Sequence, residues 1–313
     1  MSNSTIWANL LHLGYNMWSD RPVLEGEKGY VEHIGAMPYL RFDTRLWDEL
    51  IHKMAEIGMN MLVIDLGEGV EYQSHPELAV KGSWSVDKLK GELAKLRELG
   101  IEPIPKLNFS ACHDTWMGPY SRCVSTPAYY KVCSDLIAEV LDIFNCPRFF
   151  HLGMDEETYG NQTRYEYAVV RLHDLWWKDF YFLVEQVEKG GSRAWIWSDY
   201  LWQHKDTFGE KMPKSVLQSN WHYGNSFSMK LDWTKAFPYL ESCGYDQIPT
   251  GSNWFHSSNF EKLVPFCTKH IAPERLLGFM TTPWRPTIMQ FRDVHIQALE
   301  QLQRAKLKFE RKR

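Results

Sequence analysis

A repeated unit of helix, glycine and strand constrains the fold of this chain more than any other feature. Residues 44–57 have apolar side chains spaced as on one face of a helix, a glycine follows as a stop, and the apolar run 61–64 predicts a strand. The same order returns with a helix at 85–99, a second glycine and a strand at 101–107. Such alternation is typical of parallel sheets that are covered by helices.

The alternation continues to the end of the chain. Helical patterns also cover residues 128–144, 172–188, 232–242, 259–270 and 289–310. The remaining strands are predicted at 11–15, 149–153, 193–197, 216–221, 247–251 and 276–280. Eight strands alternating with helices predict an α/β fold, a single (β/α)8 TIM barrel that occupies residues 1–313 as one domain. An open doubly wound sheet is the alternative, but the first predicted strand lacks the Gly-rich phosphate turn common in such sheets.

Composition disfavours several classes of partner. The net charge of −4 gives no electrostatic reason to expect a nucleic acid or an anionic membrane. Six scattered cysteines without C-x-x-C spacing suggest neither a zinc knuckle nor a redox pair. The chain has no run of 18 apolar residues, and its first residues lack the form of a signal peptide. We therefore expect a soluble protein, either cytoplasmic or secreted after loss of a leader; its oligomeric state is left open.

The strand predicted at 149–153 is followed by three carboxylates, Asp155, Glu156 and Glu157, and has His151 inside it. In a barrel of parallel strands, the residues that follow the carboxyl ends of the strands gather at one face, where active sites lie. This stretch is therefore predicted to be a catalytic strand.

Other strand ends add carboxylates, histidines and aromatic side chains to the same face. The residues concerned are Asn16, Trp18, Asp65, Glu68, Asn108, His113, Trp197, Asp199, Trp221, His222, Tyr223, Asn253, Trp254 and Trp284. Cleavage of a glycosidic bond needs a proton donor, a negative group that stabilises an oxocarbenium-like charge, and walls that hold the sugar ring. Most of the 14 tryptophans of the chain are expected in the core, but those at strand ends suit sugar faces.

Three segments, in this order, resemble family 20 glycoside hydrolases, the β-N-acetylhexosaminidases. Residues 54–65 read Met-Ala-Glu-Ile-Gly-Met-Asn-Met-Leu-Val-Ile-Asp, residues 101–105 read Ile-Glu-Pro-Ile-Pro before His113, and residues 151–156 read His-Leu-Gly-Met-Asp-Glu. The family has a Lys-x-Asn strand, then an Ile-x-x-Ile-Pro strand followed by Pro-Gly-His, and then the signature His-x-Gly-Gly-Asp-Glu. Three ordered matches are more specific than one short motif.

The resemblance implies a retaining, substrate-assisted mechanism, in which the 2-acetamido oxygen of the substrate attacks the anomeric carbon. Glu156 would be the general acid and base, and Asp155 would orient the acetamide group. The resemblance implies a carbohydrate substrate, and we expect neither a cofactor nor a metal. The residues predicted to bind the substrate or position the acid pair are Asn16, Asp65, His113, His151, Trp197, Asp199, Trp221, Tyr223, Asn253, Trp254 and Trp284.

The sequence departs from the family pattern at the outer sugar contacts. The first strand lacks the family's arginine, with only Arg21 nearby, and Lys106 replaces a glutamate in the third. The eighth strand leads to Trp-Arg-Pro at 284–286, where the family has Trp-x-Glu. The tyrosine that holds the acetamide carbonyl has no clear counterpart, and Tyr223 and Tyr245 are the candidates to replace it. The acid pair is therefore kept while the outer contacts differ.

Three alternatives stay open at this point. A carbohydrate-binding barrel without turnover would explain the missing outer contacts. An ordinary two-carboxylate glycosidase would use Glu156 together with Asp199. A metal site built from His113, His151 and Asp155 has suitable ligand atoms but none of the spacings typical of metal motifs, such as H-E-x-x-H.

Overall fold

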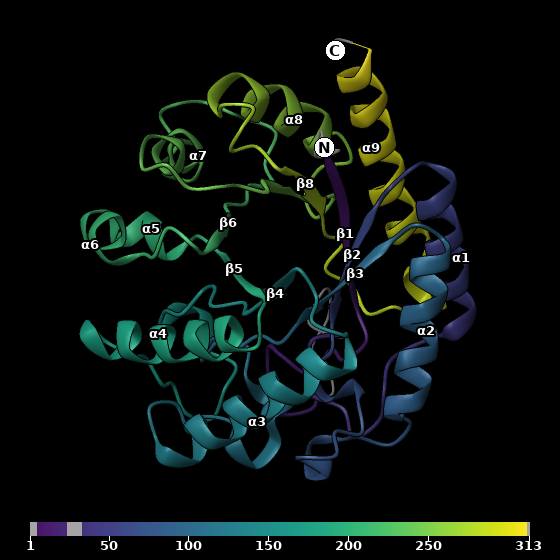
Figure 1. Ribbon diagram of the computed structural model, residues 1–313, viewed down its shortest axis with the longest axis vertical. Helices are drawn as coiled ribbons and strands as arrows, with labels where there is room; N and C mark the ends of the chain where they lie inside the picture. Colours follow the sequence, from purple (N-terminus) through teal and green to yellow (C-terminus); the bar gives the residue numbers. More distant parts are fainter. Residues whose placement is uncertain (1–4, 24–32, 312–313) are drawn as a thin grey trace.

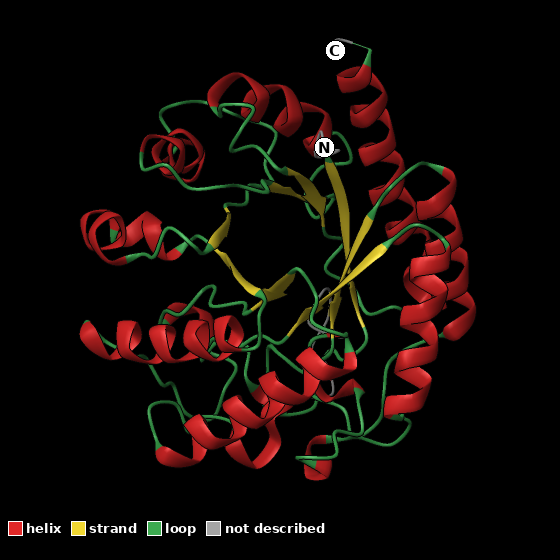
Figure 2. Ribbon diagram, in the orientation of Figure 1, coloured by secondary structure: helices red, strands yellow, loops and turns green. Residues whose placement is uncertain are grey.

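The chain folds into a ring of parallel strands surrounded by helices (Figures 1 and 2). The computed structural model describes residues 5–23 and 33–311. Residues 1–4, which belong to the segment that was compared with a signal peptide, lie outside the described residues. The strands are β1 Ile6–His12, β2 Met61–Asp65, β3 Glu102–Lys106, β4 Phe149–His151, β5 Arg193–Trp197, β6 Leu217–Ser219, β7 Thr250–Gly251 and β8 Gly278–Thr281. They pair in the order β6-β5-β4-β3-β2-β1-β8-β7, and parallel bridges at Gln218–Gln247 and Trp221–Thr250 join the two ends. The predicted (β/α)8 barrel is confirmed.

The helices form the outer layer of the barrel (Figure 2). They are α1 Thr44–Glu56, α2 Val86–Glu98, α3 Pro127–Ile143, α4 Asp174–Lys189, α5 Tyr200–Gln203, α6 Lys205–Lys211, α7 Asp232–Ser242, α8 Asn259–His270 and α9 Arg292–Glu310. Side-chain oxygens of Asp43 and Ser85 cap α1 and α2 by accepting from Arg45 N and Lys88 N. In the described ranges, none of these helices is long and apolar enough to cross a membrane.

Two parts of the prediction need correction. The first strand was expected at 11–15 but is Ile6–His12, whose seven residues are all buried. Because both faces of this strand are covered, it lacks the alternation of apolar and polar residues that marks a half-exposed strand. The helices α5 and α6, between β5 and β6, were not predicted, since α5 has only four residues and α6 has seven.

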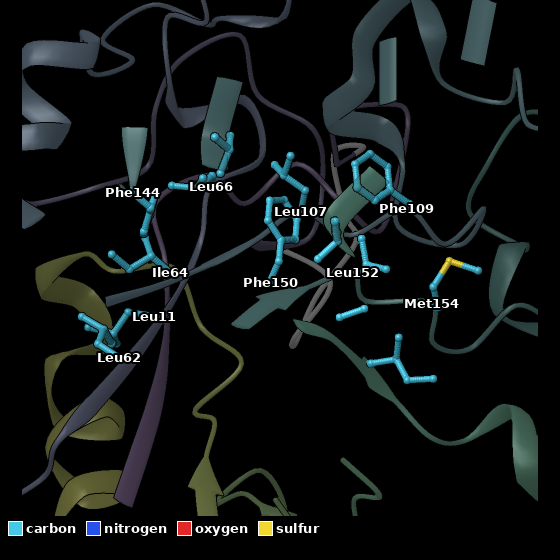
Figure 3. Close-up of a cluster of buried hydrophobic side chains, with 14 of the residues drawn as sticks. Leu11, Leu62, Ile64, Leu66, Leu107, Phe109, Phe144, Phe150, Leu152 and Met154 are labelled. Atoms are coloured by element: carbon cyan, nitrogen blue, oxygen red, sulfur yellow. The ribbon is translucent and has the colours of Figure 1, made fainter. Parts of the chain in front are cut away.

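The apolar core has two shells, because side chains along a strand alternate between the inside and the outside of the barrel. Leu62, Ile64, Phe150 and Leu152 lie in the outer shell between strands and helices, and Figure 3 shows them with their neighbours. The inner shell fills the barrel with the alternate residues, which include Met61, Val63, Ile104, Phe149, Trp195 and Trp197. The alternation therefore decides which residues can reach the centre of the barrel.

Charged residues at inward positions form a buried cluster near the carboxyl ends of β1–β3. The Lys106 ammonium contacts the Asp65 carboxylate, and the side chains are 0% and 4% exposed. His12 Nδ1 lies 3.2 Å from Asp65 Oδ2. Burial by itself would raise the pKa of Asp65, but the charge of Lys106 and the contact with His12 hold it below its ordinary value. Lys106, which departs from the family pattern, is thus the counter-ion of Asp65.

We expect Lys106→Met to lower the free energy of unfolding by about 3–5 kcal/mol, because it leaves the Asp65 carboxylate buried without its counter-ion. Replacing both partners, with Asp65→Leu in the same chain, should restore most of the loss. Urea denaturation measures both effects. Lys95→Met, which breaks a part-exposed pair with Asp48, is the matched control and should cost roughly 1 kcal/mol or less. Equal losses for the two lysine variants would contradict this account.

Candidate active site

A cavity of about 640 Å³ lies among the loops that follow the carboxyl ends of the strands. Seven of the predicted site residues line it: His113, Asp155, Glu156, Trp221, Tyr223, Trp254 and Trp284. Other residues of its wall are Met17, Trp18, Ile34, Asn108, Gly160, Asn161, Thr163, Arg164 and Phe255. The structure thus gathers the acid pair, one histidine and several aromatic rings around one space.

Two predicted residues, Asn16 and Asn253, hold loops in place and do not line the cavity. Asn16 Oδ1 accepts hydrogen bonds from Met37 N and Arg41 Nη2, both at 2.9 Å. Asn253 Nδ2 donates to Val294 O at 2.9 Å, close to the start of α9. Both side chains are engaged with neighbouring loop or helix residues.

Three others, Asp65, His151 and Trp197, are buried in the barrel beneath the cavity. His151 Nδ1 accepts a hydrogen bond from Gly153 N at 3.0 Å, and its ring lies 4.5 Å from that of Trp197. The Trp197 ring in turn lies 5.7 Å from Trp284, which does line the cavity. His151 and Trp197 therefore support the floor of the cavity, while Asp65 belongs to the charged cluster below it.

The acid pair lies on a turn with unusual backbone geometry. After β4, Gly153, Met154 and Glu156 have φ values of +72°, +70° and +57°. Such left-handed conformations are costly for residues other than glycine and persist only where the surroundings enforce them. At Gly153, a Cβ would lie 2.0 Å from Asn108 Oδ1, so no larger residue fits. The Glu156 carbonyl accepts from Asn161 Nδ2 at 3.0 Å, which helps to fix the turn.

Asp155 is held as a buried anion. Its Oδ1 accepts a hydrogen bond from Asn108 Nδ2 at 2.8 Å, and its Oδ2 lies 3.3 Å from His113 Nε2. Burial by itself would raise the pKa of Asp155, but the charge of His113 and the contacts with His113 and Asn108 outweigh it and lower the pKa to about 2. Asp155 is therefore ionised at neutral pH.

His113 bridges the two carboxylates, because its Nε2 also lies 3.4 Å from Glu156 Oε2. Burial would lower the pKa of His113, yet the negative charge of Asp155 and the contacts with both carboxylates raise it to about 10. Nitrogen and oxygen atoms of His113, Asp155 and Glu156 lie within 4.8 Å of one another, a spacing that could suit a metal ion. A protonated imidazole has no free lone pair, however, so His113 fits the role of a cation better than that of a ligand.

Asp199 lies behind Glu156 and uses both of its oxygens. Its Oδ2 accepts from Glu156 N at 2.8 Å, and its Oδ1 accepts from Trp221 Nε1 at 3.2 Å. Burial and the nearby charge of Asp155 raise the pKa of Asp199 to about 7. Asp199 thereby links the backbone of Glu156 to an aromatic wall of the cavity.

The aromatic wall also contains one of the two tyrosines that the sequence analysis offered as candidates, Tyr223. Tyr223 lines the cavity, and its hydroxyl accepts a hydrogen bond from Trp284 Nε1 at 2.9 Å. Tyr245 instead donates to Met212 O and is fully buried away from the cavity. Of the two candidates, only Tyr223 can contact a molecule in this space.

Several wall residues had not been predicted. Asn161, Thr163 and Arg164 belong to the long connection between β4 and α4, and Phe255 lies in the loop after β7. No local pattern points a loop residue toward a cavity, because its direction depends on how the loop packs. Phe255, directly after Trp254, is the one that a search for aromatic residues near strand ends could have found.

The fold is similar to solved family 20 structures. An exo-β-N-acetylglucosaminidase from Vibrio harveyi, in complex with N-acetylglucosamine, matches 97% of this chain and 56% of its own length with 12% identity and a TM-score of 0.63. A β-N-acetylhexosaminidase from Bacteroides fragilis matches 95% and 65% with 13% identity and a TM-score of 0.63. A β-hexosaminidase from Streptomyces plicatus, in complex with N-acetylglucosamine, matches 96% and 62% with 13% identity and a TM-score of 0.64.

These likenesses confirm the predicted resemblance at the level of the fold. The chain has the architecture of the catalytic barrels of family 20 glycoside hydrolases. It spans little more than half the length of the Vibrio harveyi protein. No protein-family model and no curated protein matches the sequence.

We expect the contacts of His113 with the two carboxylates to stabilise the folded protein at neutral pH and to lose this effect as the pH becomes alkaline. Its pKa of about 10 exceeds the ordinary 6.5, so its contribution is complete below about pH 6.5 and is lost as the pH rises through 10. The free energy of unfolding of the wild type should fall more steeply between pH 7 and 10 than that of His113→Gln. The free energy of unfolding is measured by urea denaturation at each pH. If it fell equally with pH in the wild type and in His113→Gln, the stabilising contacts of His113 would be contradicted. ¹⁵N NMR of the imidazole gives the pKa of His113 directly.

Proposed function

We propose that this chain is a glycosidase that removes terminal β-linked N-acetylhexosamine by a retaining, substrate-assisted mechanism. The observation that carries the proposal is the pairing of a buried anion, Asp155, with a half-exposed carboxyl group, Glu156, at one cavity wall. A site that only binds a neutral sugar does not need an anion next to a proton donor. Cleavage assisted by the acetamide group uses the proton donor and the anion. The likeness of the fold to family 20 barrels adds support.

In the first step, the acetamide carbonyl oxygen attacks the anomeric carbon and the glycosidic bond breaks. The bonding electrons pass to the leaving oxygen, which takes a proton from Glu156. Asp155 accepts a hydrogen bond from the acetamide N–H and stabilises the positive charge of the oxazolinium ring. Its low pKa suits this task, because Asp155 must remain ionised throughout.

In the second step, water attacks the anomeric carbon, the bond from this carbon to the acetamide oxygen breaks and its electrons return to that oxygen, and Glu156 takes the proton of the water. Because each of the two steps inverts the anomeric carbon, the configuration is retained overall. The charged His113 contacts both carboxylates and would keep them in their relative positions. The Tyr223 hydroxyl, oriented by Trp284, is the candidate to bind the acetamide carbonyl. The rings of Trp221, Trp254 and Trp284 would face the sugar.

The contacts of Asp199 argue against a two-carboxylate mechanism. Both of its oxygens already accept hydrogen bonds, and its pKa of about 7 leaves it partly protonated at neutral pH. A nucleophile needs a free, ionised oxygen that faces the anomeric carbon. Asp199 therefore suits the positioning of Glu156 better than attack on the substrate.

We expect Glu156→Gln to lower kcat on aryl β-N-acetylhexosaminides by about 10²–10⁴-fold, because the proton donor is lost. The assay compares aryl β-N-acetylglucosaminide and β-N-acetylgalactosaminide with the plain glucoside and galactoside. Cleavage of only the acetamido sugars supports substrate assistance. Glu166→Gln, an exposed change in the same loop, is the matched control and should leave kcat unaltered. Sugar binding without turnover of any of the four glycosides would instead indicate a binding barrel.

We expect Asp199→Asn to retain turnover with kcat reduced by about tenfold, because the amide keeps one acceptor and loses the other, which loosens the position of Glu156. Asp206→Asn, on the exposed side of α6, is the control. Loss of all turnover in Asp199→Asn, with rescue by an external nucleophile such as azide, would instead identify Asp199 as the nucleophile.

A further inference from the structure

The proposed function leaves one carboxylate of the acidic turn without a role. Glu157 directly follows Glu156, yet it does not line the cavity that holds the acid pair, and its side chain is only 2% exposed. Its Oε1 accepts a hydrogen bond from Arg171 Nε at 2.7 Å, and its Oε2 accepts one from Arg171 Nη2 at 2.5 Å. Glu157 is therefore one half of a buried ion pair that is closed by two parallel hydrogen bonds.

Arg171 also binds the helix and the loop that flank the turn. Its Nη1 donates to Asp179 Oδ2 of α4 at 3.2 Å, and its Nη2 donates to Phe109 O, in the loop after β3, at 3.1 Å. Burial by itself would lower the pKa of Arg171, but the charge of Glu157 and the neighbouring acidic groups raise it. Arg171, whose side chain is 1% exposed, is therefore a buried cation that is fixed from several sides.

The Arg171–Glu157 pair adjoins the left-handed turn that carries the acid pair. Met154 and Glu156 have φ values of +70° and +57°, which the surrounding contacts must enforce. Arg171 Nη2 lies 3.8 Å from Met154 Sδ, so this guanidinium contacts residues on both sides of the acid pair. The bond from Glu156 N to Asp199 holds the start of Glu156, whereas Arg171 holds the residue that follows it.

We propose that Arg171, through Glu157, is a positioning residue that keeps the Glu156 carboxyl group directed at the glycosidic oxygen. The inference rests on the proposed function, in which Glu156 gives its proton to that oxygen. Neither Arg171 nor Glu157 lines the cavity, so both act through Glu156. Two parallel bonds from a planar guanidinium fix the direction of a carboxylate as well as its distance. Without them the turn relaxes, Glu156 moves away from the oxygen, and proton transfer slows.

The test compares two substrates that differ in how much they need the proton of Glu156. Phenyl N-acetyl-β-glucosaminide releases a basic phenolate, which must be protonated as it leaves. The dinitrophenyl glycoside releases a weakly basic ion, which leaves without a proton. The quantity measured is the ratio of kcat/KM for the phenyl glycoside to kcat/KM for the dinitrophenyl glycoside. A loss of folded protein lowers both values equally, so a merely structural role would leave this ratio unaltered.

Glu157→Gln and Arg171→Lys should each lower this ratio about tenfold, because neither variant can form two parallel bonds between opposite charges. Arg122→Lys is the matched control. The Arg122 side chain is 12% exposed and donates to the side chains of Asp114 and Gln162, which lie outside the turn. This control should lose stability without a change in the ratio.

An unaltered ratio in both test variants, with the two glycosides still cleaved, would overturn the role of Arg171 and leave the proposed function standing. A lower ratio in Glu157→Gln alone would assign the effect to the Glu157 carboxylate and would also contradict the role of Arg171. If the wild type cleaves no aryl N-acetylhexosaminide, the proposed function fails and this inference fails with it. If the aryl galactosaminide is the better substrate, the same two leaving groups are compared on that sugar.

Discussion

The strict alternation of side chains along closed parallel strands is the constraint on which this molecule depends. In a ring of strands, every second residue must point into a space that is filled by side chains. Along β3, Ile104 and Lys106 occupy such positions, and Lys106 meets Asp65 from β2. The next residue of the same parity, Asn108, already reaches the cavity and binds Asp155. The apolar inner core, the charged cluster and the acid pair are therefore successive levels of one barrel interior.

Charged side chains at the carboxyl ends of the strands then determine which carboxyl groups near the cavity are ionised. Asp155 is kept ionised by His113 and Asn108, while the pKa of Asp199 is raised by burial and by the charge of Asp155. Opposite shifts of two nearby carboxyl groups give them different tasks. The left-handed turn at Gly153, Met154 and Glu156 stores strain at this point, and hydrogen bonds from the surrounding loops hold it.

Sequence reasoning found the fold and the centre of the candidate site but not its edges. Acidic residues that follow an apolar strand identified Asp155 and Glu156, and an ordered motif added His113. Position after a strand was a less specific guide. Asn16 and Asn253 satisfy it but bind backbone atoms and loop neighbours, since a polar side chain near a strand end can also serve to fix a loop. The residues of α5 were missed because four residues are too few to show a helical period.

The sequence by itself determined the barrel, because helical and strand periods are local properties that repeat along the chain. Eight such units without a Gly-rich phosphate turn after the first predicted strand favour a barrel over an open doubly wound sheet. It also determined that an acid pair ends the fourth strand. Tertiary structure alone decided that Lys106 neutralises Asp65, that Tyr223 rather than Tyr245 faces the cavity, and that Asp199 holds the backbone of Glu156. Each of these three contacts joins residues that are distant in the sequence and meet only when the ring of strands closes. The local spacing of apolar residues carries no information about which distant residues will meet.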